Sequence, residues 1–186
     1  KRDWSSDVCS SDLSGKTTLL RVLTGLYEAQ SGQIQVNGKA VSNGSLEDYR
    51  HLFATVFSDY HIFKKPYGME DEAIVRMKKY LIDLKISEKL PENLSGGYDP
   101  AALSTGQRKR LALALAVAED RPILVLDEWA ADQDPAFRQR FYRVILPWIK
   151  SSGKAIIAVT HDERYFDAAD RRYHMENGVL TRVDVP

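Results

Sequence analysis

Two short, continuous apolar runs constrain the fold of this chain more than any other feature. They cover residues 123–126 and 155–159, and neither alternates with polar residues. Continuous runs of this length are typical of strands that are covered on both faces in a parallel sheet. Between them, Asp134 as N-cap and Pro135 at the first helical position predict a helix, with a kink near Pro147. Strand, helix and strand in this order predict a βαβ unit, and therefore an α/β fold with a mostly parallel sheet flanked by helices.

The other elements are predicted from periodicity, caps and turn pairs. The helix after Pro135 carries one apolar stripe, formed by Phe137, Phe141, Val144, Ile145 and Trp148. The remaining expected elements are a helix over 15–26, a hairpin turning at Asn37-Gly38, a buried strand over 52–57, an amphipathic helix over 70–84, a helix capped by Ser104 and running to Ala118, and a C-terminal hairpin turning at Asn177-Gly178.

Size and composition limit the classes of protein to which the chain can belong. It has 186 residues, 44% of them apolar, and a formal net charge of zero. This length fits one domain, or one domain with a small subdomain, and is sufficient for a sizeable core. Zero net charge indicates no bulk nucleic-acid-binding surface, so no nucleic-acid partner is expected. The longest apolar stretch, 111–118, is far shorter than the ~20 residues of a membrane span.

The first 13 residues are interpreted as foreign to the protein. Residues 4–13 read as the translation of a common sequencing-library adapter, and they include Cys9, the single cysteine. A natural Ser- and Asp-rich N-terminus is the alternative, whereas a signal peptide would need an apolar stretch that this segment lacks. With one cysteine no intramolecular disulfide can form, which favours a cytosolic setting. We expect the natural protein to continue upstream of Ser14.

A segment near the start carries the chemistry of a phosphate-binding loop. It consists of Ser14, Gly15, Lys16, Thr17 and Thr18. Backbone N–H groups at a helix start can receive phosphate oxygens, the Lys16 ammonium can neutralise β- and γ-phosphate charge, and the Thr17 hydroxyl can bind Mg²⁺. Thr18 is expected near the α-phosphate. The full motif has a glycine five positions before Gly15, where this chain has Ser10. Taken alone, the segment fits an ordinary helix start better than a phosphate-binding loop.

Asp127 and Glu128 directly follow the apolar run at 123–126. Two adjacent carboxylates at the end of a buried strand are costly unless they meet cations or water. We interpret Asp127 as the residue that holds Mg²⁺ through its water shell. Glu128 is interpreted as the general base that polarises the attacking water. The alternative is that both carboxylates simply face solvent at the strand end.

A small polar turn opens the helix that ends at Ala118. Its residues are Ser104, Thr105, Gly106 and Gln107. The Ser104 hydroxyl and the Gly106 N–H, at a helix N-terminus, are suited to binding a γ-phosphate. Ser95-Gly96 looks similar, but Asp99-Pro100 follows it rather than a helix, so we interpret that segment as a turn without a binding role.

These motifs, followed by His161 at the end of the second apolar run, stand in a recognisable order. From Ser14 to its C-terminus the chain resembles the nucleotide-binding domain of an ATP-binding cassette (ABC) transporter. The resemblance implies a P-loop NTPase fold over residues 14–186, with a small helical subdomain at about 64–110 that contains the signature motif. It further implies that the domain binds ATP with Mg²⁺ and hydrolyses it. His161 would then contact the γ-phosphate and orient water.

The resemblance also implies partners. Residues 131–134 occupy the loop that crosses the interface of a head-to-tail dimer, in which the Ser104 turn of one copy completes the site of the other. The stretches 56–59, 127–135 and 160–167 are most similar to bacterial cyclic-peptide and siderophore-peptide exporters. Those exporters carry a transmembrane domain ahead of the ATPase on the same chain, and that domain decides the substrate. The expected location is the cytoplasmic face of the bacterial inner membrane.

One departure from the family and two alternative functions remain. Ser58 stands where most members carry a glutamine that contacts metal and water. Since Ser58 is too short to reach as glutamine does, Asp59 or a water molecule would take over that contact. The first alternative function is a soluble ABC ATPase acting on nucleic acid or ribosomes, although the sequence has no tandem cassette, long coiled coil or basic extension. The second is an inactive fragment that keeps the fold only.

Overall fold

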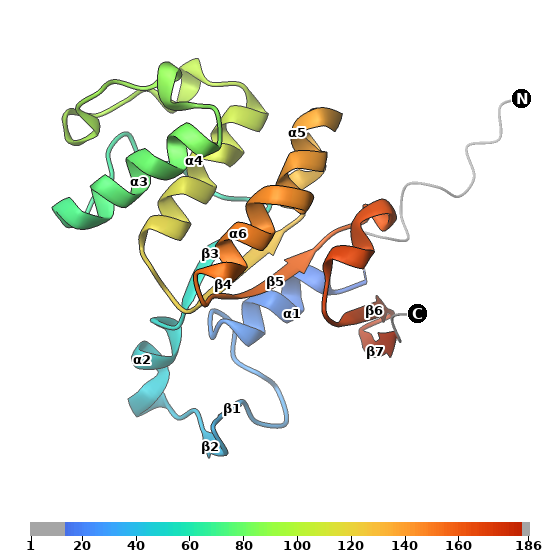
Figure 1. Ribbon diagram of the computed structural model, residues 1–186. Coiled ribbons are helices and arrows are strands. Elements are labelled where there is room, and N and C mark those ends of the chain that lie inside the picture. The colour runs from blue at the N-terminus through green and yellow to red at the C-terminus, as the bar shows by residue number, and fades with distance from the viewer. Residues whose placement is uncertain (1–13, 184–186) are drawn as a thin grey trace, which may run out of the picture. The chain divides into compact units, whose positions relative to one another are not determined.

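The computed structural model describes residues 14–183, and the segment interpreted as foreign, 1–13, lies outside the described residues. The described chain divides into two compact units. Residues 14–49 and 162–183 belong to the first unit, and residues 50–161 form the second. Figure 1 labels the helices and strands of both.

The first unit contains two antiparallel hairpins. β1 (Gln35–Val36) pairs with β2 (Lys39–Ala40), and β6 (Arg172–Glu176) pairs with β7 (Val179–Val183). Both hairpins turn at an Asn-Gly pair in which both residues have positive φ, at Asn37-Gly38 and at Asn177-Gly178. This backbone geometry matches the right-handed twist of paired strands, and Asn-Gly is the dipeptide that adopts it most readily. Both predicted hairpins are confirmed.

The helical elements around the first unit are short. They are α1 (Lys16–Leu23), the 3₁₀ turn Asn43–Ser45, α2 (Leu46–Arg50) and the 3₁₀ turn Glu163–Ala168. α1 ends before residue 26, where the sequence pattern places its end. The Thr24 hydroxyl bonds the carbonyl of Leu20 at 2.8 Å, and Gly25 follows with a φ of 73°. A left-handed glycine is a common helix terminator, so the chain leaves the helix there.

A three-stranded parallel sheet lies at the centre of the second unit. Its order is β3 (Phe53–Val56), β4 (Ile123–Asp127), β5 (Ala155–Val159). In β4 the four residues from Leu124 to Asp127 are buried. Phe53 aligns with Ile123 in the first pair of strands, and Ile123 aligns with Ala155 in the second. The predicted βαβ unit and parallel sheet are confirmed.

β5 is less covered than its sequence predicts. Its continuous apolar run predicts a strand that is buried on both faces, but Ala155 and Ala158 are exposed. β5 and β3 both lie at an edge of this three-stranded sheet, but β3 is mostly buried because α4 packs on it. Coverage by a helix, rather than the apolar run itself, therefore decides how far each edge strand is buried.

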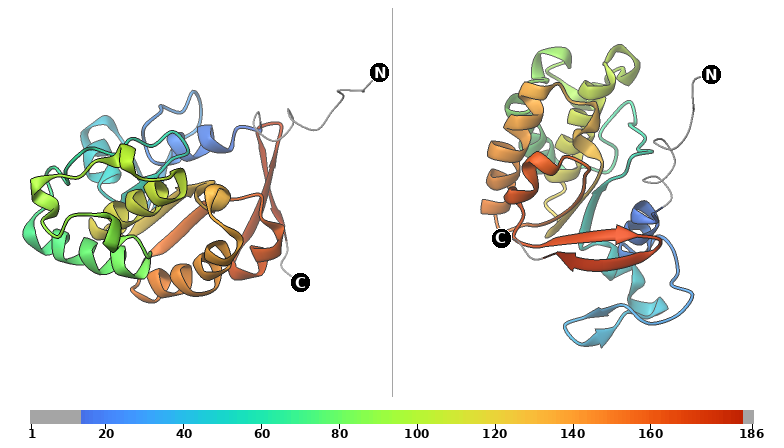
Figure 2. Two further views of the ribbon diagram at one scale, coloured as in Figure 1. Left: turned by 90° about the horizontal axis from the view of Figure 1, so that it is seen from above. Right: turned by 90° about the vertical axis from the view of Figure 1, so that its right-hand side faces the viewer.

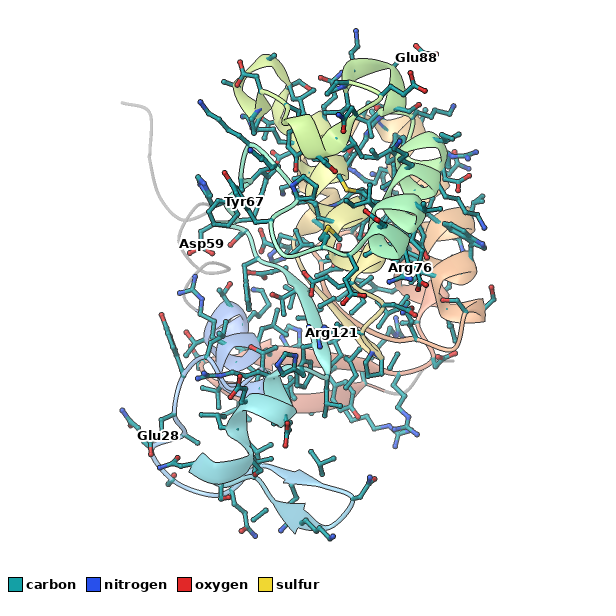
Figure 3. All side chains as sticks on the ribbon, turned by 90° about the vertical axis from the view of Figure 1, so that its left-hand side faces the viewer. Glu28, Asp59, Tyr67, Arg76, Glu88 and Arg121 are labelled. Carbon is teal, nitrogen blue, oxygen red and sulfur yellow. The ribbon has the colours of Figure 1, made fainter. Side chains whose placement is uncertain are left out.

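Helices of the second unit supply most of its core. They are α3 (Asp71–Asp83), α4 (Thr105–Ala118), α5 (Pro135–Arg140), a π-helical stretch (Phe141–Ile145) and α6 (Leu146–Ser151), with 3₁₀ turns at Ser87–Lys89, Leu94–Gly96, Pro100–Ala102 and Trp129–Asp132. α3 packs on α4, and α4 packs on β3. Met77, Leu111 and Leu113 are completely buried. Arg76 of α3, labelled in Figure 3, donates a hydrogen bond from Nε to the carbonyl of Ala118 at 3.1 Å.

One helical path leads from β4 back to β5 and runs alongside the sheet (Figure 2). Asp134 caps it as predicted, because its carboxylate accepts a hydrogen bond from the Phe137 N–H at 2.8 Å. An irregularity is expected near Pro147, and the structure shows it as the π-helical stretch Phe141–Ile145 just before this residue. Because proline has no backbone N–H, the usual helical hydrogen bond to the preceding turn is missing, and a widened turn accommodates the loss of that bond. Val144 is 51% exposed, so its place in the apolar stripe was wrong. The wider turn rotates it off the buried face.

Candidate functional site

The phosphate-loop residues lie at the start of α1 in the first unit. Gly15 is its N-cap, with a left-handed φ of 89°, and a Cβ at this position would lie 3.2 Å from Met175 Cε. The carbonyl of Ser14 accepts a hydrogen bond from the Gly178 N–H, and the Lys16 ammonium donates to the Ser14 hydroxyl at 2.8 Å. The first N–H groups of a helix have no carbonyl one turn earlier to bond. This loop therefore combines an ammonium with a helix N-terminus.

Thr17 and Thr18 follow within the first turn of α1. Thr17 is partly buried and Thr18 is exposed. Both hydroxyls thus belong to the same helix start as Lys16, which is the position that a phosphate-binding loop requires of them. Their assignment to Mg²⁺ and to the α-phosphate stays a prediction.

Asp127 is the last residue of β4 in the second unit, and it is 2% exposed. The Ser58 hydroxyl, just beyond β3, donates a hydrogen bond to its Oδ2 at 3.2 Å. Ser58 stands where the family resemblance leads one to expect a glutamine, and here it orients the buried carboxylate. Asp59, labelled in Figure 3, is exposed.

Glu128 follows Asp127 with an unusual backbone. Its φ is 49° and its ψ is 34°, in the left-handed region, which costs a residue other than glycine about 1–3 kcal/mol. Its N–H donates to the carbonyl of Val159 at 3.0 Å, so the strained residue stays attached to the end of β5. Strain of this kind persists only where surrounding contacts impose it, and such places are often functional.

The Glu128 side chain meets His161. The two come from the ends of adjacent parallel strands, and Glu128 Oε1 lies 2.9 Å from His161 Nε2. An ionised carboxylate can only accept, so the imidazole donates its Nε2–H in this contact. The His161 side chain is 51% exposed and that of Glu128 is 33% exposed, so both can reach a solvent-borne substrate. The Tyr142 hydroxyl, 2.7 Å from that of Thr160, supports the strand end beside His161.

The polar turn at Ser104 opens α4 through reciprocal caps. The Ser104 hydroxyl accepts a hydrogen bond from the Gln107 N–H at 3.3 Å, and the Gln107 side-chain oxygen accepts one from the Ser104 N–H at 3.0 Å. These two side chains therefore build the turn itself. The N–H groups of Thr105 and Gly106 lie in the first turn of the helix, where an anion binds best.

The similar segment at Ser95-Gly96 forms no such site. It is a 3₁₀ turn over Leu94–Gly96, capped by the Asn93 side chain, and no α-helix begins there. A single 3₁₀ turn has too few aligned peptide units to produce a useful dipole. The interpretation of this segment as a turn agrees with its structure.

Gly106 is required by close packing. A Cβ there would lie 2.8 Å from the carbonyl oxygen of Asp132. We expect Gly106→Ala to destabilise the protein by about 1–3 kcal/mol, because this overpacking outweighs the helix propensity gained from alanine, at most about 1 kcal/mol. Thermal or urea unfolding measures the change.

Gly96→Ala is the matched control for this prediction. The nearest atom to a Cβ at Gly96 is Asn93 Nδ2 at 3.6 Å, an ordinary contact, so its unfolding curve should stay close to that of the parent protein. Equal stability of the two variants would show that the Asp132 carbonyl moves aside without penalty.

Two basic side chains of α4 bond the loop that follows β4, and the sequence analysis did not predict these contacts. Arg110 donates to Gln133 Oε1 at 2.8 Å and contacts Asp134 Oδ2 at 3.0 Å. Lys109, which is 5% exposed, contacts Asp132 Oδ2 at 2.7 Å. The Phe137 N–H and the Arg110 guanidinium together lower the pKa of Asp134 below its usual value. The sequence signal for these contacts was the basic run 108–110, which precedes the apolar turns of the same helix.

A comparison with known families decides the class of this protein. Residues 14–131 match the family model described as ABC transporter. The chain belongs to the ABC transporter family. It is 45% identical over 169 residues to the ATP-binding protein SyrD of Pseudomonas syringae pv. syringae, and the matched region covers 89% of this chain and 30% of SyrD. It is 33% identical over 181 residues to the energy-coupling factor transporter ATP-binding protein EcfA1 of Streptococcus mutans serotype c, and that matched region covers 93% of this chain and 65% of EcfA1. The chain thus spans less than two thirds of both relatives.

The ABC fold is supported independently by a solved structure. The dimeric post-hydrolysis state of the ATP-binding cassette MJ0796, bound to ADP and Pi, superposes with a TM-score of 0.71 at 20% identity, covering 92% of this chain and 82% of that chain. The recognition of an ABC ATP-binding domain and the predicted P-loop NTPase fold are confirmed. A domain of this family is an ATPase.

A carboxylate of the second unit fits the magnesium ion that the family resemblance implies. Within residues 14–183 no three His, Cys, Asp or Glu side chains gather as a metal site. Mg²⁺ commonly uses only one or two protein carboxylates, with substrate phosphates and water as its other ligands. The buried Asp127 carboxylate, oriented by Ser58, provides the hard oxygen ligand that this requires.

None of the helices in the part of this ABC chain that the structure describes combines the length and apolar character of a membrane span.

Proposed function

We propose that this chain is the ATP-hydrolysing domain of an ABC exporter. It binds ATP with Mg²⁺, hydrolyses the γ-phosphate bond and drives a transmembrane domain that moves a peptide-like substrate. One observation carries the proposal: Glu128 and His161 meet at 2.9 Å beside the buried Asp127, at the carboxyl ends of two adjacent parallel strands. In open α/β sheets, this end of the strands is where ligands bind.

ATP binding is assigned to the loop at α1 together with Asp127. Lys16 neutralises the charge of the β- and γ-phosphates, and the N–H groups of the α1 start bond their oxygens. Thr17 and Asp127 are the residues that would hold Mg²⁺, and the ion would supply positive charge for the phosphate oxygens.

Hydrolysis is assigned to Glu128 and His161. The Glu128 carboxylate accepts a proton from a water molecule while the water oxygen bonds to the γ-phosphorus. The bond between that phosphorus and the β–γ bridging oxygen breaks, and ADP and phosphate leave. His161 orients the Glu128 carboxylate through its Nε2–H and contacts the γ-phosphate. Little covalent chemistry falls to the protein, so positioning and charge stabilisation dominate.

A second copy of the domain is proposed to complete each site. Ser104, Gly106 and Gln107 of one copy face the γ-phosphate bound by the other, in a head-to-tail dimer at the cytoplasmic face of the bacterial inner membrane. The turn that begins α4 supports this role because it offers the first N–H groups of a helix N-terminus, which favour a bound anion. The stretches 56–59, 127–135 and 160–167 support the peptide-exporter assignment through their resemblance to that subfamily.

A complementation experiment tests the head-to-tail dimer. Lys16→Ala disables the loop of its own copy, and Ser104→Arg blocks the turn that a copy offers to its partner. Each variant alone should be inactive. A mixed dimer regains one intact site, since the intact loop of the second variant meets the intact turn of the first.

The assay is ATP turnover of co-expressed full-length variants, purified through two different affinity tags. Ser95→Arg, in the similar turn that begins no helix, is the matched control and should stay active. A mixed dimer as inactive as its two parents would argue against a site shared between copies.

A further inference from the structure

Lys109 is a buried ammonium in the middle of the second unit. Its side chain is 6% exposed, and its Nζ makes two contacts in the loop that follows β4. One is an ion pair with Asp132 Oδ2 at 2.7 Å, and the other is a hydrogen bond donated to the main-chain carbonyl of Glu128 at 2.9 Å. A buried charge must be paired and hydrogen-bonded to be tolerated, and these two contacts meet that need.

The contact with Glu128 falls on the strained residue of the site. Glu128 is held in the left-handed region from both sides, because its N–H bonds Val159 and its carbonyl accepts from Lys109. The carbonyl of Lys109 in turn accepts a hydrogen bond from Trp129 Nε1 at 2.8 Å, immediately after Glu128. Lys109 of α4 is thus hydrogen-bonded to two consecutive residues: its ammonium bonds the Glu128 carbonyl, and its own carbonyl bonds the Trp129 indole.

We propose that Lys109 is a positioning residue for ATP hydrolysis, which holds the backbone of Glu128 so that its carboxylate faces His161. The proposal rests on the proposed function, since it assumes that Glu128 is the general base. Lys109 itself touches neither the Glu128 carboxylate nor His161, so it acts through the main chain. Because α4 begins at the Ser104 turn, the same lysine ties that turn to the general base of its own subunit.

Lys109→Met tests the role directly, because methionine fills a similar volume without the ammonium. We expect the kcat of the full-length protein for ATP to fall about 10- to 100-fold, the usual consequence of a catalytic group displaced by about 1 Å. The dissociation constant for ATP should stay within about two-fold, because the lost contact serves the chemical step rather than binding.

Lys154→Met is a closely matched control. Lys154 is also buried, pairs with a carboxylate (Asp120 Oδ1, 2.5 Å) and donates to a main-chain carbonyl (Arg121, 3.0 Å), but at the amino ends of β4 and β5. Its replacement should lower the melting temperature as Lys109→Met does, yet leave kcat within about two-fold. If both variants lose kcat equally, the effect of Lys109 is general destabilisation and the proposal fails.

A double variant separates positioning from structure more sharply. In a Glu128→Gln background the general base is already absent, so adding Lys109→Met should not lower the residual turnover further. A further fall by the same factor as in the parent protein would overturn the proposal, as would a kcat for Lys109→Met equal to that of the parent. If Lys109→Met does not fold, Lys109→Gln is subjected to the same comparison.

The experiment also separates this inference from the proposed function beneath it. If Glu128→Gln alone leaves turnover unchanged, the general-base assignment fails, and the role of Lys109 fails with it. If Glu128→Gln is defective while Lys109→Met is fully active, only the positioning role is wrong.

Discussion

Replacing Glu128 by glutamine should cut ATP turnover by about 10²–10⁴-fold, the usual size of a lost general base. Glutamine keeps the shape and one carbonyl oxygen of the side chain, so the contact with His161 can still form. What it loses is the ability to take a proton from water. ATP binding should therefore be retained, and the variant should accumulate bound nucleotide that it cannot process. Steady-state turnover and a direct ATP-binding titration on the full-length protein measure the two effects separately.

Glu119→Gln provides the same chemical change away from the site. Glu119 lies at the end of α4, where its carboxylate is 3.5 Å from Arg121, and both side chains are partly solvent-exposed. Its substitution should leave turnover unchanged, since exposed ion pairs contribute about 0–1 kcal/mol. Unchanged turnover in Glu128→Gln would remove the central assignment of the proposed function.

Replacing Lys16 by alanine should abolish ATP binding in practice, weakening it by about 30- to 5,000-fold. The expected loss corresponds to a charged hydrogen-bonded pair with one partner removed, roughly 2–5 kcal/mol. The Lys16 ammonium lies within the loop, because it donates a hydrogen bond to the Ser14 hydroxyl at 2.8 Å. Turnover falls with binding in this variant, in contrast to Glu128→Gln.

Lys39→Ala is the control for this second prediction. Lys39 is an exposed residue of β2 in the same unit, so its loss removes an equal charge without touching α1. Fluorescence or calorimetric titration with ATP should give the parent affinity for Lys39→Ala and no measurable binding for Lys16→Ala. Equal affinities in both variants would mean that the loop at α1 does not hold the phosphates.

Much of the local structure could be predicted because its causes lie within a few residues. The Asn-Gly turns, the Ser104 and Asp134 caps and the continuous apolar run of β4 each depend on short-range geometry, and all are present in the structure. Local reasoning failed where neighbours decide. The exposure of β5 depends on which helices pack on each edge strand, and that of Val144 depends on a π-helical turn that Pro147 accompanies.

The sequence by itself determined the α/β class, the order of the motifs and the residue types available for phosphate, metal and base. Only the tertiary structure decided how those residues act on one another: Ser58 on Asp127, His161 on Glu128 and Lys109 on the Glu128 backbone. These pairs lie 69, 33 and 19 residues apart in the chain. Periodicity and capping report interactions within a turn or a strand, whereas contacts of this range arise from strand register and helix packing, which no short sequence window contains.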